Sequence, residues 1–177
     1  TVADILYLTP EGAPHVFRPP ASALKGNDTI PDRRGYNFDG CSPNILISKA
    51  SVKDHRIVFP GGASYRLLVL PGVETMTPEL LDKIESLVND GATIIGNPPL
   101  KSPSLVNYPE CDKIVRSKAE KLWGELKASL KTTELKIGEG KIYPCTTDFK
   151  VDSTTLYPDY DFTAAIIKQT GVPEDFS

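Results

Sequence analysis

The sequence is poor in the side chains that build most metal centres and covalent catalytic sites. It holds two histidines, His15 and His55, so a metal site made of several histidines is excluded. Its three cysteines, Cys41, Cys111 and Cys145, are far apart and form no C-x-x-C pair, which argues against a zinc site and a disulfide framework. We expect them to be small buried residues, with one disulfide in an oxidising compartment as the alternative.

Long apolar runs and an excess of positive charge are also absent from the sequence. No run approaches the roughly 20 residues that cross a bilayer. The formal net charge of −3 gives no electrostatic reason to expect nucleic acid or an anionic membrane as a partner. Gly61-Gly62 and Gly138-x-Gly140 lack the spacing of a phosphate-binding loop. The sequence begins with Thr and shows no signal peptide, so we expect a chain that was processed or cut from a larger protein.

The stretch from Tyr65 to Pro99 predicts a strand, a helix and a second strand. Residues 67–70 are continuously apolar, which is typical of a strand covered on both faces. Thr77 can cap a helix with Pro78 at its first position, and the apolar residues 92–95 form the second strand. Because the connection has the length of a crossover helix, the two strands should be parallel. This pattern predicts a layered α/β domain.

Weaker patterns place further elements along the chain. We expect strands at residues 4–8 and 35–41, and the second of these should enter a turn at Asp39-Gly40. A hairpin is expected at 56–65 and two short strands within 134–143. Helices are expected to start at Pro43, to run from Cys111 to about Leu130, and to span 161–170. The hydrophobic fraction of 40% and the length of 177 residues suit one globular domain over residues 1–177.

Four loops, at residues 9–18, 39–42, 71–74 and 96–99, are the candidate functional region, and the first three carry the candidate side chains. In an open parallel sheet, ligands bind beyond the carboxyl ends of the strands, and these four loops should lie there. We expect six side chains to gather as a ligand-facing or interdomain rim. They are Glu11, His15, Arg18, Asp39, Cys41 and Glu74. The alternative is that they are polar side chains on separate, exposed loops.

A thiol with a neighbouring base would support nucleophilic catalysis, and Cys41 with His15 is the pair that this chain offers. The two residues lie on different loops. The sequence Gly40-Cys41-Ser42 also lacks the flanking glycines of a sharp strand-to-helix elbow. A free-standing thiol enzyme is therefore the weakest of the functional hypotheses.

Glycoside hydrolysis would need two carboxylates about 5 to 10 Å apart. Glu11, Asp39 and Glu74 could approach one another, but nothing in the sequence sets their separation. Trp123 could stack on a sugar ring, although its helical spacing favours a place in the core. We find no complete catalytic set, and we assign no catalytic residue, no metal and no cofactor.

Three segments resemble class I glutamine-amidotransferase-like domains, which are flavodoxin-like modules found in large glycoside hydrolases. They are Tyr65–Pro71, Thr77–Leu81 and Asn89–Ile95. The resemblance implies a three-layer α/β fold with a mainly parallel central sheet and helices on both faces. The nucleophile elbow of the amidotransferases and its His-x-Glu partner are both missing here, so the resemblance implies no catalytic residue.

Three other segments resemble more particularly the α-L-rhamnosidases of glycoside hydrolase family 106. They are Leu6–Ala13, Gly35–Pro43 and Gly171–Phe176. The catalytic carboxylates of that family are expected on a (β/α)₈ barrel, for which 177 residues are too few.

The resemblance implies an accessory, non-catalytic domain of a large bacterial glycoside hydrolase that packs on the catalytic barrel and helps to shape the substrate cleft. Its partners would be the other domains of the same polypeptide and a rhamnose-containing polysaccharide. Such a parent is expected in the periplasm or at the cell surface. The alternatives are a carbohydrate-binding module and an oligomerisation module.

Overall fold

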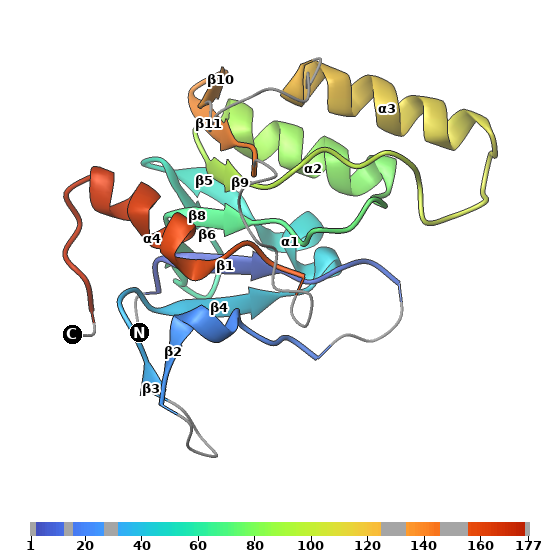
Figure 1. Ribbon diagram of the computed structural model, residues 1–177. Coiled ribbons are helices and arrows are strands. Elements are labelled where there is room, and N and C mark those ends of the chain that lie inside the picture. The colour runs from blue at the N-terminus through green and yellow to red at the C-terminus, as the bar shows by residue number, and fades with distance from the viewer. Residues whose placement is uncertain (1–2, 13–15, 27–31, 125–133, 146–155, 176–177) are drawn as a thin grey trace.

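A six-stranded, mainly parallel sheet forms the centre of the computed structural model, which describes residues 3–12, 16–26, 32–124, 134–145 and 156–175. Its strands are β1 (Ile5–Leu8), β4 (Phe38–Cys41), β8 (Leu67–Val69), β9 (Thr93–Ile95), β10 (Leu135–Ile137) and β11 (Gly140–Tyr143). They lie in the order β10-β11-β9-β8-β1-β4, and only the pair β10-β11 is antiparallel (Figure 1).

Four α-helices and two small sheets surround this sheet within the described residues. The helices are α1 (Pro43–Lys49), α2 (Pro78–Asn89), α3 (Glu110–Trp123) and α4 (Tyr160–Gln169), and a short 3₁₀ turn, η1, spans Ala21–Ala23. The small sheets pair β2 (Leu24–Lys25) with β3 (Asp32–Arg33), and β5 (Ser51–Lys53) with β6 (Arg56–Val58) and β7 (Ser64–Tyr65). The fold class is thus mixed α/β, as the sequence predicts.

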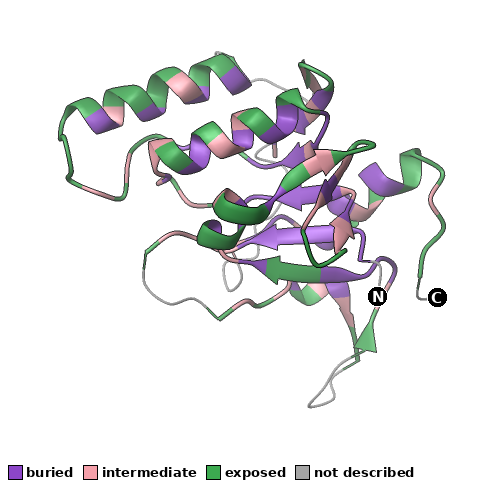
Figure 2. Ribbon diagram, turned by 180° about the vertical axis from the view of Figure 1, so that it is seen from behind, coloured by how far each residue is buried: buried purple, intermediate pink, exposed green. Residues whose placement is uncertain are grey.

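Alternate residues of the strands enter two different apolar clusters. Leu6 and Leu8 of β1 pack in one cluster with the buried sides of α1, α2 and α3. Ile5 and Tyr7, between them, pack in the other cluster with the buried side of α4. Figure 2 shows the central strands as almost wholly buried, while the outward sides of the helices are exposed. A strand covered on both faces needs no polar alternation, which explains its continuously apolar sequence.

The unit β8-α2-β9 confirms the prediction for residues 65–99. Thr77 is the residue that caps α2, and its hydroxyl oxygen accepts a hydrogen bond from the Leu80 N–H at 3.2 Å. Pro78 occupies the first turn, where a backbone N–H would have no acceptor within the helix, so its missing N–H costs nothing. Gly91 follows the helix with φ of 112°, and β9 then pairs with β8 in parallel.

Two details differ from the prediction. Asp39 and Gly40, expected in a turn, lie inside β4, where Gly40 pairs with Tyr7 of β1. A β-carbon at Gly40 would meet the Phe17 ring at 2.5 Å, so this glycine makes room for an aromatic ring rather than for a turn. The helix expected to reach about Leu130 ends as α3 at Trp123, followed by Gly124 with φ of 67°. Residues 125–133 of that prediction lie outside the described residues.

The cysteines and Trp123 pack much as the sequence suggests. Cys41 and Cys111 are buried, Cys145 is half-buried, and all three thiols are free. Trp123 lies in the core and donates its indole N–H to the Gly96 carbonyl at 2.9 Å. In the part of the chain that the structure describes, the helices are too short or too polar to cross a bilayer.

Candidate functional site

A cleft of about 520 Å³ lies where β1 and β4 end, and this is the edge at which the sequence predicts a ligand-facing rim. The loop after β1, the first turn of α1 and the start of α2 form its walls. Its polar lining includes Thr9, Glu11, Ser42, Asn44, Thr77 and Ser104. Of the five predicted rim residues that the structure describes, Glu11 is the one that lines this cleft.

Glu11 is held by the start of α2. One carboxylate oxygen accepts a hydrogen bond from the backbone N–H of Thr77 and the other from the Thr77 hydroxyl, both at 2.6 Å. That hydroxyl in turn accepts the Leu80 N–H. The carboxylate therefore satisfies donors at a helix N-terminus, where negative charge is favoured. Both oxygens of Glu11 have a partner within the chain.

Asp39 lies on the outermost strand and not on a loop. Its carboxylate accepts a hydrogen bond of 3.0 Å from the hydroxyl of Tyr65, at the end of β7. Burial, followed by the hydrogen bond to Asp39, raises the pKa of Tyr65 to about 12. The phenol therefore keeps its proton at neutral pH, and its role toward Asp39 is that of a donor.

Cys41 is the last residue of β4 and packs in the cluster of α1 and α2, with 6% of its surface exposed. Its thiol lies 3.3 Å from the Ser42 carbonyl oxygen, to which it donates a hydrogen bond. Burial raises the thiol pKa to about 11. Because the thiolate is the nucleophile, this environment suppresses reactivity rather than promoting it.

The remaining rim residues lie apart from these contacts. Glu74 is exposed, with a carboxylate oxygen 4.0 Å from the Lys101 ammonium, and its carbonyl accepts the N–H groups of Leu100 and Lys101. Arg18 is exposed on the loop after β1. His15 lies outside the described residues. The structure thus connects Glu11 to α2 and Asp39 to Tyr65, and gives each carboxylate a different neighbour.

The residues Leu156 and Tyr157 lie across the ends of β1 and β8. The hydroxyl of Tyr157 donates to the Leu8 carbonyl at 2.8 Å, and the Leu156 carbonyl accepts the Gly72 N–H at 2.6 Å. Tyr157 is buried against Tyr7, with the ring centroids 4.8 Å apart. The apolar triplet Leu156-Tyr157-Pro158 within a polar stretch was the sequence signal that could have indicated a buried segment.

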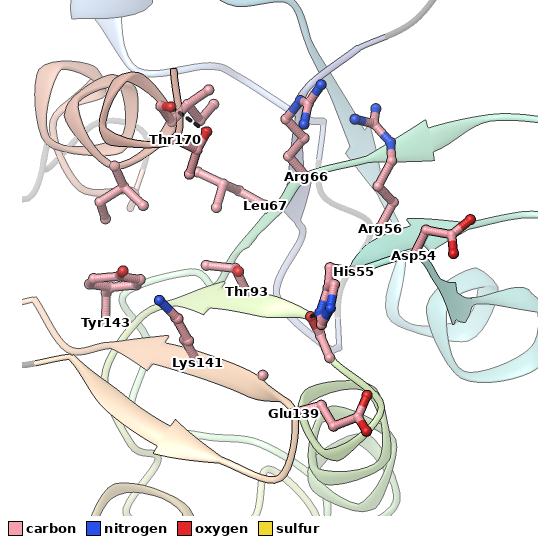
Figure 3. A pocket seen from close by; sticks show the side chains of 14 residues that line it. Asp54, His55, Arg56, Arg66, Leu67, Thr93, Glu139, Lys141, Tyr143 and Thr170 are labelled. Atoms are coloured by element: carbon pink, nitrogen blue, oxygen red, sulfur yellow. Dashed lines mark hydrogen bonds between the residues drawn. The ribbon is translucent and has the colours of Figure 1, made fainter. Parts of the chain in front are cut away.

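A second cavity, of about 470 Å³, lies at the opposite edge, where β8, β9 and β11 begin. Leu67, Ile166 and Ile167 give it an apolar wall, while Thr93 and Tyr143 add hydroxyl groups. Figure 3 shows the side chains that line it around a common space, among them Leu67, Thr93 and Tyr143 of the sheet and Asp54 and His55 of the β5-β6 turn.

Basic side chains border this second cavity. Arg66 pairs with buried Asp4 at 2.8 Å, while Arg56 lies 4.0 Å from the same carboxylate. Burial lowers the pKa of Arg56, and the nearby Arg66 lowers it further. Lys141 pairs at 3.0 Å with Glu134. The Asp4 carboxylate is thus shared by two guanidinium groups at the border of the second cavity.

The described side chains do not assemble a recognisable reaction centre. Within the described ranges, no cluster of three or more His, Cys, Asp or Glu residues could hold a metal ion. The thiol of Cys41 is buried and protonated, and the carboxylates of Glu11 and Asp39 accept bonds from neighbouring side chains.

Comparison with known proteins places the chain among glycoside hydrolases. A family model described as alpha-L-rhamnosidase matches residues 1–170. A protein of Formosa agariphila named "Putative beta-glucuronidase" is 40% identical over 126 residues, which are 70% of this chain and 10% of that protein. A solved rhamnosidase structure from Novosphingobium sp. PP1Y superposes with a TM-score of 0.66 and 25% identity, covering 97% of this chain and 14% of that one. The chain therefore spans a small part of either relative.

Proposed function

The chain belongs to the alpha-L-rhamnosidase family, and we propose that it is a non-catalytic accessory domain of a longer bacterial glycoside hydrolase. In this proposal it packs on the catalytic barrel and helps to shape the substrate cleft. The observation that carries the proposal is the crevice between β1 and β8, which the chain's own Leu156 and Tyr157 occupy.

That crevice is where open parallel sheets usually bind their ligands. Here the Leu8 carbonyl accepts the Tyr157 hydroxyl, and the Gly72 N–H donates to Leu156. The backbone groups that would contact a ligand are therefore used within the chain. The chain itself thus occupies the part of the usual ligand edge between β1 and β8, while the cleft lined by Glu11 stays open beside it.

The acidic side chains support the same proposal. A catalytic carboxyl group must lie within hydrogen-bond reach of the proton that it transfers, so it has to point toward the substrate. Both oxygens of Glu11 accept bonds from Thr77, and Asp39 accepts one from Tyr65. In the proposed parent, the catalytic carboxylates belong to the barrel.

The finer architecture belongs to this proposal as well. In chain order, the parallel strands β4-β1-β8-β9-β11 are the second, first, third, fourth and fifth, which is the strand order of flavodoxin-like folds. We infer a three-layer, class I glutamine-amidotransferase-like domain over residues 1–177, cut from a larger multidomain protein. Its partners are the other domains of that polypeptide, and a rhamnose-containing polysaccharide is the inferred substrate of an exported parent.

The decisive experiment measures hydrolysis of aryl α-L-rhamnosides by the longer polypeptide and by the isolated chain. We expect turnover by the former and none by the latter. In the longer polypeptide, Glu11→Gln and Asp39→Asn should leave kcat within about twofold, since loss of a general acid or base costs about 10²- to 10⁴-fold. The matched control is a Glu→Gln substitution on the barrel. Turnover by the isolated chain that either substitution abolishes would overturn the proposal.

Carbohydrate binding is the second candidate, and the cavity at the amino ends of β8 and β9 favours it. Sugar sites combine an apolar surface with a few convergent polar groups. Here Leu67 and Ile166 provide the surface, and Thr93, Lys141 and Tyr143 provide the polar groups (Figure 3).

Calorimetric titration with rhamnose-containing oligosaccharides tests this candidate. Binding should weaken at least fivefold in Thr93→Val, which removes a hydroxyl from the cavity at nearly constant volume. Ser48→Ala, which changes an exposed hydroxyl on α1, is the control. Absence of binding heat at millimolar oligosaccharide would reject carbohydrate binding at this cavity.

A further inference from the structure

An uncharged, apolar turn projects from the loop between β9 and α3. The residues from Ser102 to Pro109 carry no charge. Within them, Leu105 is 82% exposed, Val106 71% and Tyr108 64%. We name these three side chains the apolar turn. Figure 1 shows the loop extending beyond the ends of α2 and α3, at the carboxyl edge of the sheet.

The backbone of this loop is fastened although its side chains are exposed. The Asp112 carboxylate accepts the Ser102 N–H at 2.8 Å, and the Leu105 carbonyl accepts the Tyr108 N–H at 3.1 Å. Arg116 of α3 donates to the Leu100 carbonyl at 3.1 Å. The apolar turn is thus presented in a defined shape, which lowers the entropic cost of binding a partner.

Charged residues at the border of the apolar turn have partners within the chain. Lys113 pairs with Glu110 at 2.7 Å, and Lys101 lies 4.0 Å from Glu74. A partner therefore does not need complementary charges at this position. An apolar centre with a polar border is the usual anatomy of a protein interface.

Other apolar side chains are exposed at the same edge of the sheet. Val16 follows β1 and is 82% exposed, and Ile45 lies in the first turn of α1, directly after β4. The cleft lined by Glu11 and Ser104 lies between these elements and the loop. Exposed apolar groups concentrated at one edge mark an interaction surface.

We propose that the apolar turn is the surface by which this domain docks onto an apolar face of the catalytic domain in the same polypeptide. The inference rests on the proposed accessory function. The relatives are the reason to expect the catalytic domain at this surface. The chain corresponds to 10% of one relative and 14% of the other, so most of such a polypeptide is available to cover the turn. A second copy of the chain is the competing occupant.

The test introduces Leu105→Asp and Val106→Asp together, in the isolated chain and in the longer polypeptide. The thermal midpoint of the isolated chain should not change, because both side chains are exposed there. In the longer polypeptide the two charges would be buried, so the midpoint should fall by about 3 °C or more. Ala165→Asp, at an exposed position of α4, is the matched control: its cost in helix propensity is local, so it should lower the midpoint by the same amount in both.

Amide hydrogen exchange provides the second measurement. The amides of Leu105–Tyr108 should exchange at least tenfold more slowly in the longer polypeptide than in the isolated chain. Slowed exchange at another surface only, with no effect of the Asp pair, would overturn this docking surface and leave the accessory function intact. Sedimentation of the isolated chain as a dimer that the Asp pair dissociates would assign the surface to a second copy and also overturn the inference.

Discussion

The carboxylate of Glu11 completes the cap of helix α2 from another part of the chain, accepting the N–H and the hydroxyl of Thr77 at 2.6 Å each. In a capping box, the side chain three residues after the cap returns a bond to the cap's N–H. That residue here is Leu80, which cannot do so. Glu11, 66 positions away in the sequence, supplies the missing acceptor.

Glu11→Ala should therefore lower the free energy of unfolding by about 1–2 kcal/mol, because two donors at the start of α2 lose their acceptor. Thr77→Ala should cost a similar amount, and the double variant should cost less than the sum. Urea unfolding followed by circular dichroism measures all three, with the exposed Glu139→Ala as the control. Strictly additive losses would contradict the coupling.

Gly40→Ala should destabilise the protein by about 1–3 kcal/mol, because its β-carbon would lie 2.5 Å from the Phe17 ring. Gly61→Ala is the matched control, since no atom lies within 4 Å of its added β-carbon. Phe17→Leu in the Gly40→Ala background should recover part of the loss. Thermal unfolding of these three variants and the unsubstituted chain checks this, and equal midpoints for both alanine variants would refute it.

Cys41 should alkylate slowly at neutral pH. Burial raises its pKa to about 11, so the reactive thiolate is scarce at pH 7 and should increase about tenfold per pH unit below that value. The measurement is the rate of iodoacetamide labelling in a Cys111→Ser, Cys145→Ser background, with the urea-unfolded chain as the reference. Rapid stoichiometric labelling of the folded chain at pH 7 would restore the hypothesis of a catalytic thiol.

Tyr143→Phe should destabilise the protein more at pH 7 than at pH 3. The hydrogen bond from Tyr143, followed by that from Lys141, lowers the pKa of Glu134. A carboxyl group with a lowered pKa stabilises the fold above its ordinary pKa of 4.5, and this contribution is lost as pH falls through the folded value.

The expected loss for Tyr143→Phe at pH 7 is about 1 kcal/mol, which is typical of one hydrogen bond. Tyr108→Phe removes a hydroxyl from an exposed ring and should have no effect at either pH. Urea unfolding at the two pH values gives the comparison. A loss of the same size at pH 3 and pH 7 would show that the bond to Glu134 does not contribute.

The parts of the fold that were predictable from the sequence are those with local signals. Thr77, Pro78 and Gly91 mark the ends of α2, and they do so through bonds and backbone angles within a few residues. The hairpin β10-β11 follows in the same way from the glycines at 138 and 140. Such elements depend little on distant parts of the chain.

The candidate site was less predictable because its contacts are distant in sequence. Glu11 reaches Thr77, Asp39 reaches Tyr65, and Tyr157 reaches Leu8 across 149 positions. Gly40 was misassigned to a turn for the same reason, since the ring that requires a glycine there belongs to Phe17. A single sequence carries no signal for partners of this kind.

The place of Asp39 on β4 has a consequence for solubility. Among the described residues β4 ends the sheet, so the outer side of its backbone pairs with no further strand there, although the Phe38 carbonyl accepts a hydrogen bond from the Arg33 side chain. A free edge of this kind can recruit strands from other molecules into fibrils, and a charge on it opposes such stacking. We therefore expect the exposed carboxylate of Asp39 in the middle of β4 to oppose intermolecular sheet growth.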